Sequence, residues 1–336
     1  MTSSATGGRL LGIVLLGVLL ALAILLSLTA GARPTGPATA WAALTDFDPL
    51  SADQQVIREL RLPRTLLGLL VGAALGLSGA VLQGVTRNPL ADPSLLGIHA
   101  GAALAVVIGI FGFGLSTPRT HVWCALLGAG GAMLLVHAIA AAGRDGATPV
   151  KLALAGAAVT AALMSVVSAV LLLSPHTLDQ LRFWQVGALA GRDFAVITDV
   201  APFLVLGMAA ALAAGPLLDG LAMGEDMARA LGQRVERSRL LAGAAAVVLA
   251  GAATAAAGPI AFVGLTVPHA SRALVGPSYR WILPYSLLLA PILLLGADVA
   301  GRLVAPPGEV QVGVVTAALG APVFIALVRG RRLAGL

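Results

Sequence analysis

Long apolar runs dominate the chain, and short segments that carry most of the charged residues separate them. A helix that crosses the hydrocarbon core of a bilayer needs about 20 mostly apolar residues. Runs of this kind predict ten membrane-spanning helices, near residues 10–30, 65–84, 95–115, 121–142, 151–173, 194–214, 240–257, 260–275, 281–297 and 309–328. The eighth run, 260–275, is the weakest, because it is short and is interrupted by Gly264 and Pro268.

The first run has two interpretations. Arg9 precedes it and Leu28-Thr29-Ala30 follows it, an arrangement that also occurs in cleaved secretory signal peptides. Its apolar stretch of about 21 residues is longer than the core of about 7–15 residues that is typical of a signal peptide. We therefore expect an uncleaved first helix.

Composition excludes a protein that folds in water. Hydrophobic residues make up 58% of the 336 residues and charged residues only 11%, whereas a soluble domain has about 25% charged residues. Soluble enzymes, nucleic-acid-binding proteins and disordered chains are excluded, although the net charge is +6. The 41 glycines suit the close approach of helices in lipid. The sequence predicts an all-α polytopic membrane protein in which residues 1–336 form one transmembrane domain.

Basic residues predict the orientation. With an even number of spans, both termini lie on one side of the membrane. If that side is the cytoplasm, 13 of the 21 Arg and Lys residues face inward and 8 face outward. The acidic residues divide the other way, 6 inward and 9 outward. Because cytoplasmic loops carry an excess of basic residues, we expect cytoplasmic termini.

The sequence contains no recognisable catalytic or energy-supplying site. Carriers coupled to protons or sodium usually need a carboxylate in mid-membrane, and the predicted spans carry none at their centres. A membrane-embedded enzyme is disfavoured because no paired carboxylates, HExxH or GxSxG motif occurs. The single lysine, Lys151, is not part of a phosphate-binding loop. We expect neither a metal nor a cofactor, and energy for uphill transport has to come from another protein.

The longest hydrophilic segment on the predicted inner side, residues 219–237, has the pattern of a short helix with one apolar stripe. Met223, Met227 and Leu231 recur every four residues, and Glu225 and Arg229 are spaced to pair on its flank. Flexible methionine side chains on one face suit docking into a groove of another protein. The alternative is a helix that lies on the lipid headgroups, which the small apolar face and the internal acids disfavour.

Several motifs resemble those of one family. Gly224-Glu225-x-x-Ala228-x-x-Leu231-Gly232 is similar to the coupling-loop motif of permeases of binding-protein-dependent ABC importers. In chain order, the other blocks resemble the FecCD permease family, and residues 178–185 are most similar to its ferric-enterobactin type. These blocks are RLPRT at 61–65, GAVLQ at 79–83, NPLADP at 88–93 with Leu96-Gly97, LDQLRFWQ at 178–185, GPIAFVGL at 258–265 with Val267-Pro268-His269, and GVVTA at 313–317 with GAP at 320–322.

The resemblance implies a fold, a function and partners. It implies the permease fold of the large, type II ABC importers, in the inner (cytoplasmic) membrane of a bacterium. Two copies of a cytoplasmic ATPase, a second permease (a paralogue or an identical copy) and a periplasmic or lipid-anchored binding protein complete such an importer. The cargo expected from the resemblance is a ferric siderophore, and haem or cobalamin is the alternative within the family. A proton-coupled carrier is a further alternative from another class.

The resemblance also implies roles for particular residues. The fifth and tenth helices, 151–173 and 309–328, are expected to line the passage, and Thr148, Pro149 and Val150 lie where the family has its inner gate. The segment 219–237 is the expected coupling loop. Outward-facing arginines of the family dock the binding protein, and the matching positions are Arg61, Arg64 and Arg302. Contact with the ATPase is implied for Met223, Gly224, Glu225, Met227, Ala228, Leu231 and Gly232.

Overall fold

The computed structural model describes residues 3–31, 33–142, 148–230, 232–305 and 308–329, and every regular element within them is a helix. The elements in chain order are α1 (Ser3–Thr29), α2 (Pro37–Thr45), α3 (Ala52–Gln55), the π-helix η1 (Val56–Arg61), α4 (Leu62–Thr86), the 3₁₀ helix η2 (Pro93–Leu96), α5 (Ile98–Phe113), α6 (Pro118–Ala141), α7 (Pro149–Leu173), α8 (Pro175–Gln185), α9 (Phe194–Ala213), α10 (Gly215–Ala222), α11 (Glu225–Ala230), α12 (Val235–Ala257), α13 (Val263–Val275), α14 (Tyr279–Val304) and α15 (Val312–Arg329).

The predicted spans all correspond to helices, namely α1, α4, α5, α6, α7, α9, α12, α13, α14 and α15. In the described part of the chain, seven of these are long and apolar enough to cross a membrane, and α5 and α15 are shorter apolar helices. The weak eighth span is α13, with only 13 residues. The prediction of an all-helical, polytopic membrane protein with about ten spans is confirmed.

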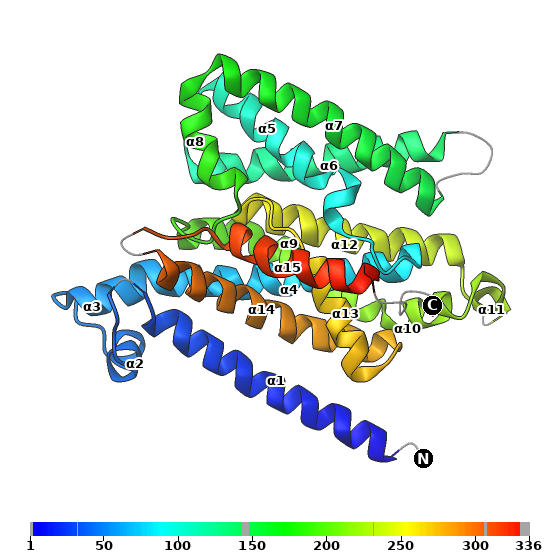
Figure 1. The fold of residues 1–336 in the computed structure, drawn as a ribbon, viewed down its shortest axis with the longest axis horizontal. Helices are drawn as coiled ribbons and strands as arrows, with labels where there is room; N and C mark the ends of the chain where they lie inside the picture. The colour runs from blue at the N-terminus through cyan, green and yellow to red at the C-terminus, as the bar shows by residue number, and fades with distance from the viewer. Residues whose placement is uncertain (1–2, 32, 143–147, 231, 306–307, 330–336) are drawn as a thin grey trace.

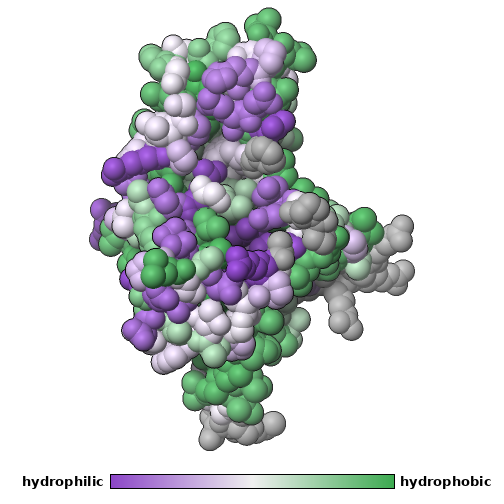
Figure 2. All heavy atoms as spheres, turned by 90° about the vertical axis from the view of Figure 1, so that its left-hand side faces the viewer, coloured by the Kyte–Doolittle hydropathy of each residue, from purple (hydrophilic) through white to green (hydrophobic). Residues whose placement is uncertain are grey.

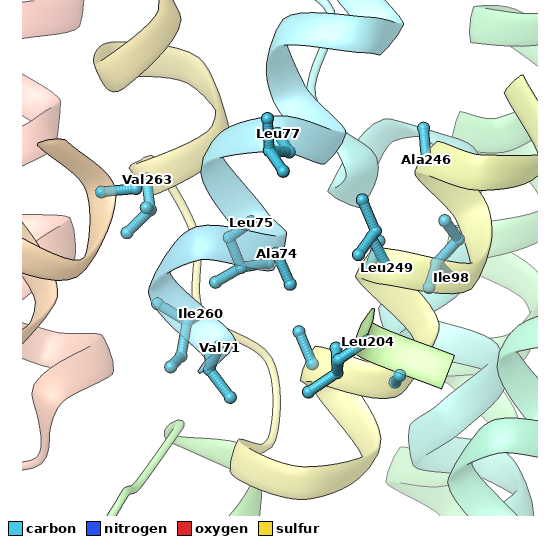
Figure 3. Packing of buried hydrophobic residues seen from close by; sticks show 14 of the residues in the cluster. Val71, Ala74, Leu75, Leu77, Ile98, Leu204, Ala246, Leu249, Ile260 and Val263 are labelled. Carbon is cyan, nitrogen blue, oxygen red and sulfur yellow. The ribbon is translucent and has the colours of Figure 1, made fainter. Parts of the chain in front are cut away.

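Helix α4 forms the centre of the bundle. In its most apolar window 83% of the residues are buried, as expected of a helix that is apolar on all sides. Figure 3 shows Val71, Ala74 and Leu75 of α4 among side chains from neighbouring helices, including Leu204 of α9 and Leu249 of α12. On another face, Gly72 and Gly76 lie so close to α14 that an added Cβ would meet the backbone of that helix. These glycines therefore let α4 and α14 pack backbone to backbone.

The other helices surround this centre in layers. Helices α5, α6 and α7 lie side by side in a layer of their own, with α8 crossing its end (Figure 1). Helix α1 lies along the opposite edge and packs on α14. Only 11% of the most apolar window of α1 is buried, and only 17% of that of α7. These two helices therefore offer long apolar faces that the chain itself does not cover.

Two irregular segments enter the bundle from opposite ends and meet. One connects α4 to α5 and contains η2, and the other connects α12 to α13. They meet at Gly264, where an added Cβ would contact Pro93 and the Asp92 carboxylate. Gly264 also lies against Gly79, seven residues before the end of α4, which is about 10 Å along a helix. Helix α13 is short because it starts this far inside the bundle.

The bundle has two distinct ends, which we name after one acidic residue each. The Asp298 end carries the carboxyl ends of α1 and α14 together with α2, α3 and α8 (Figure 1). The Glu225 end carries the first turn of α1 together with α10, α11 and the start of α12. The two ends differ in chemistry.

Candidate functional sites at the two ends of the bundle

A buried ion-pair cluster holds the Asp298 end together. The carboxylate of Asp298 is only 1% exposed. Arg64 donates to it with Nε at 3.0 Å from Oδ2 and Nη2 at 2.8 Å from Oδ1, and Arg302 Nη2 lies 3.1 Å from Oδ2. Arg64 also pairs with Glu309 at 2.6 Å, just before α15 begins. The cluster therefore joins α4, α14 and the segment that leads into α15.

The same cluster fixes the carboxyl end of α1. The last carbonyl groups of a helix have no partner within the helix, and cations near them are favourable. Arg61 donates to the carbonyl oxygens of Leu28 and Thr29, at 2.8 Å each. Arg302 donates to those of Ser27 and Ala30, at 2.9 and 3.0 Å. Guanidinium groups from η1 and α14 thus cap the carboxyl end of α1.

Of the three arginines expected to dock a binding protein, Arg64 and Arg302 belong to the ion-pair cluster, and Arg61 binds the carboxyl end of α1. Arg61, Arg64 and Arg302 are only 6%, 8% and 6% exposed. Their guanidinium groups do not lie in water, because the carbonyls of α1 and the carboxylate of Asp298 accept their hydrogen bonds. The docking role itself stays a prediction. A direct role would require these groups to exchange their internal partners for those of another protein.

At the Glu225 end, α10 and α11 form a bent helical pair. Gly224 separates them with φ of +108°, a conformation that residues with a side chain rarely adopt. Its carbonyl accepts the backbone N–H of Ala228 and so starts α11. Gly232 follows with φ of +81°. The predicted short helix is present, but α11 has only six residues, so Met223 lies at the end of α10.

Glu225 lies between two arginines at the start of α11. Its carboxylate is 2.8 Å from Arg229 Nη2 and 2.7 Å from Arg239 Nη2, which belongs to α12. The Arg239 guanidinium, and to a lesser degree that of Arg229, lowers the pKa of Glu225. A group with a lowered pKa stabilises the fold above its unfolded-state pKa, and this contribution is lost as the pH falls through the lowered value. The pair with Arg239 therefore holds α11 against α12 throughout the neutral range.

The methionines of this segment face outward. Met223 is 58% exposed and Met227 52% exposed, whereas Ala228 is fully buried. Leu231, the third residue of the predicted stripe, lies outside the described residues. Two flexible apolar side chains therefore stand free at this end beside the ion pairs of Glu225. The contact of this surface with an ATPase stays a prediction.

The start of α7 lies where the gate is expected. Thr148 caps this helix, and its hydroxyl accepts the backbone N–H of Lys151 at 3.3 Å. Pro149 is the first residue of the helix, and Val150 is 68% exposed. No group of three or more His, Cys, Asp or Glu side chains that could hold a metal ion occurs among the described residues.

Sequence reasoning missed the two acidic members of the cluster. The ninth predicted span ends at residue 297, just before Asp298, but α14 continues to Val304 and includes Asp298. Glu309 is the first residue of the last predicted span. A signal was present, because Asp298 and Arg302 are four residues apart and such pairs lie on one helix face.

Comparison with known proteins identifies the family. A model described as the FecCD transport family matches residues 19–330. The chain belongs to this family. It is 46% identical over 336 residues to the ferric enterobactin transport system permease protein FepD of Escherichia coli K12, covering all of both chains. It is 44% identical over 284 residues to the Fe(3+)-citrate import system permease protein YfmD of Bacillus subtilis 168, covering 84% of each.

A solved structure agrees with the family assignment. The chain superposes on a metal-chelate type ABC transporter in an inward-facing conformation with a TM-score of 0.81, at 30% identity, over 94% of this chain and 97% of the other. The FecCD-family chain is therefore the membrane-embedded permease of an ABC transporter and not an enzyme. Membership of this family implies an ATPase and a substrate-binding protein as its partners.

Proposed function

We propose that the chain imports a ferric siderophore across the bacterial inner membrane. The observation that carries this proposal is the 46% identity to a ferric enterobactin permease over the full length of both chains. Two copies of a cytoplasmic ATPase supply the energy, and a periplasmic or lipid-anchored binding protein delivers the chelate. The whole chain acts as one permease domain. We infer pairing with a second permease, and the resemblance to enterobactin systems favours a paralogue.

In this proposal the Glu225 end faces the cytoplasm. The first turn of α1 lies at this end together with α10 and α11 (Figure 1). Arg234 and Arg237 follow α11, and both are exposed, in line with the excess of basic residues in cytoplasmic segments. The ATPase meets Met223 and Met227 here, with Gly224, Glu225, Ala228, Leu231 and Gly232 shaping the surface. The binding protein then docks at the Asp298 end.

We assign the passage to the uncovered faces of α7 and α15. Most exposed residues in the middle of α7 are small, among them Ala157, Ala161 and Ser165, and α15 exposes Val314 and Leu319. A wall of small, weakly polar side chains binds a bulky chelate weakly and lets it leave. Thr148, Pro149 and Val150 narrow the passage at the cytoplasmic start of α7.

Because Arg61, Arg64 and Arg302 are buried, we assign them an indirect part in docking. They position the carboxyl end of α1 and the segment that leads into α15. The outer surface that these segments form is what a binding protein meets first. Loss of one of these arginines would disturb docking through this surface.

Competition for uptake tests the proposed cargo. The permease and its ATPases are reconstituted in proteoliposomes. The binding protein, loaded with a labelled ferric tris-catecholate, is added from outside. We expect the unlabelled chelate to abolish labelled uptake, and haem and cobalamin at the same concentration to leave it unchanged, because the binding protein selects the cargo. Suppression by haem or cobalamin with no effect of the ferric chelate would contradict the siderophore assignment.

A further inference from the structure

The start of α14 has no cap of its own. Ser278 stands at the N-cap position, where a hydroxyl usually accepts a backbone N–H of the first turn. Within the described residues its hydroxyl accepts no such bond. Helices α6, α7, α8 and α9 do use the residue at this position, and their caps are Thr117, Thr148, Ser174 and Asp193. The first turn of α14 therefore depends on another segment.

Asp219 of α10 supplies the missing cap. Its Oδ1 accepts the backbone N–H of Tyr279, the first residue of α14, at 2.6 Å, and its Oδ2 accepts the hydroxyl of Ser278 at 3.1 Å. The first N–H groups of a helix have no partner within the helix, and a negative charge beside them is favourable. Asp219 begins the segment 219–237, the expected coupling loop. The backbone of α14 is therefore bonded directly to this loop.

Packing fixes α10 at the same place. Leu218, beside Asp219, is fully buried. In the last turn of α4, a Cβ added at Gly84 would lie 3.0 Å from atoms of both Leu218 and the Tyr279 ring. Helix α10 thus fills the angle between the end of α4 and the start of α14. Arg280 lies outside this contact, since its side chain is exposed and forms an ion pair with Asp219 at 3.8 Å.

Helices α4 and α14 are tied together along their length, and we name them the α4–α14 unit. At the Glu225 end, Arg272 of α13 donates to the Tyr279 hydroxyl at 3.2 Å and to the side-chain carbonyl of Gln83 of α4 at 3.5 Å. The two backbones pack against each other in the middle, and Arg64 binds Asp298 at 2.8 Å at the other end. Helix α14 has 26 residues, which corresponds to about 39 Å. The unit therefore reaches from one end of the bundle to the other.

The α4–α14 unit ends in the surface that is proposed to meet the binding protein. There Asp298 holds Arg302, which caps α1, and Arg64, which also pairs with Glu309 just before α15. Figure 2 looks onto this end and shows hydrophilic residues gathered across it, with apolar residues around them. Such a surface suits a partner that arrives from water. A displacement of this surface and a displacement of the coupling loop therefore act on the same two helices.

We propose that Asp219 is the positioning residue that transmits movement between the coupling loop and the α4–α14 unit, so that a binding protein at the Asp298 end stimulates the ATPase through α14. The proposal rests on the proposed function, because it needs these two partners at opposite ends of the bundle. In this scheme Asp219 touches neither partner and acts through the first turn of α14. A side chain at position 278 could cap α14 by itself, so the stability of this helix does not require a bond to α10.

Stimulation of ATP hydrolysis by the binding protein tests this role. The full complex with its ATPases is placed in nanodiscs, and hydrolysis is measured with increasing amounts of binding protein loaded with a ferric tris-catecholate. We expect Asp219→Ala to lower the maximal stimulation at least about fivefold, the lower end of coupling between sites. Basal hydrolysis and the dissociation constant of the binding protein without nucleotide are expected to stay within about twofold of wild type, because neither contact surface is altered.

Two further variants serve as matched controls. Asp219→Asn keeps an oxygen that accepts the N–H of Tyr279, and we expect it to retain most of the stimulation. Arg280→Gln removes the exposed ion pair with Asp219 but leaves the cap in place. Because exposed pairs contribute little, we expect Arg280→Gln to change the stimulation by less than about twofold.

A double variant separates transmission from capping. Asp219→Ala combined with Ser278→Asp gives α14 a favourable cap of its own but no bond to α10. We expect the melting temperature of this permease in detergent to return to the wild-type value, while the stimulation of ATP hydrolysis stays as low as in Asp219→Ala.

Three outcomes overturn the proposal. Full stimulation in Asp219→Ala would show that no movement passes through this contact. Recovered stimulation in the double variant would show that Asp219 is only a cap. A weaker affinity for the binding protein with unchanged maximal stimulation would place the effect of Asp219 in docking. Uptake of labelled chelate by the wild type is measured separately, and its failure would overturn the proposed cargo alone, because the stimulation is read from ATP hydrolysis and not from transport.

Discussion

Replacing Asp298 with alanine is expected to destabilise the permease by about 3–5 kcal/mol, the cost of removing one partner from a buried ion pair. Asp298 is 1% exposed and accepts from both Arg64 and Arg302. Without it, two guanidinium groups stay buried, with Glu309, the Ser27 hydroxyl and the carbonyls of α1 as their remaining partners. The carboxyl end of α1 and the entry to α15 then lose their common anchor.

The melting temperature of the purified permease in detergent measures this effect. We expect it to fall by roughly 10 °C for Asp298→Ala and by less for Asp298→Asn, which keeps an acceptor. Asp179→Ala is the matched control. It also removes the carboxylate partner of an arginine, but the Asp179–Arg182 pair is exposed, and exposed pairs contribute about 0–1 kcal/mol. Equal melting temperatures for the Asp298 variant and the wild type would show that the cluster does not hold this end together.

A change in the turn between α10 and α11 is expected to reduce transport while ATP hydrolysis continues. Proline fixes φ near about −65°, whereas Gly224 has φ of +108° and its N–H bonds to the Leu221 carbonyl. Gly224→Pro therefore turns α11 away from α12. Glu225→Ala acts more locally by removing the pair with Arg239. In both variants Met227 is no longer held in place for the ATPase.

ATP hydrolysis and uptake are measured on the same proteoliposomes. We expect uptake to fall at least about tenfold, within the range of coupling energies between sites, while hydrolysis and the melting temperature of the permease stay near wild type. Glu236→Ala is the matched control, because Glu236 is an exposed acid nearby on α12 with no ion pair among the described residues. Normal uptake by both loop variants in assembled complexes would show that the coupling surface lies elsewhere.

Hydropathy alone predicted the helices well, because each span has to satisfy its own backbone hydrogen bonds and carry about 20 apolar residues. The exception is the eighth span, α13. It is weak because the chain enters the bundle as the irregular segment before Val263, and only 13 helical residues remain.

Hydropathy did not predict which charged residues are buried or which partners they have. Arg61, Arg64 and Arg302 look like surface charges in sequence, because their partners are backbone carbonyls of α1 and a carboxylate more than 200 positions from Arg64. Contacts of this range depend on packing, and local spacing indicates only the pair of Asp298 with Arg302.

The central claim is that this chain forms the passage, is connected to the ATPase by its coupling loop, and takes its energy from that other protein. Accumulation of a labelled ferric chelate in proteoliposomes tests this claim. One set contains the permease pair with its ATPases and binding protein, and the other contains the permease pair alone. The claim predicts accumulation above the external concentration only in the first set, and only with ATP. Accumulation in the second set, abolished by a protonophore, would contradict it.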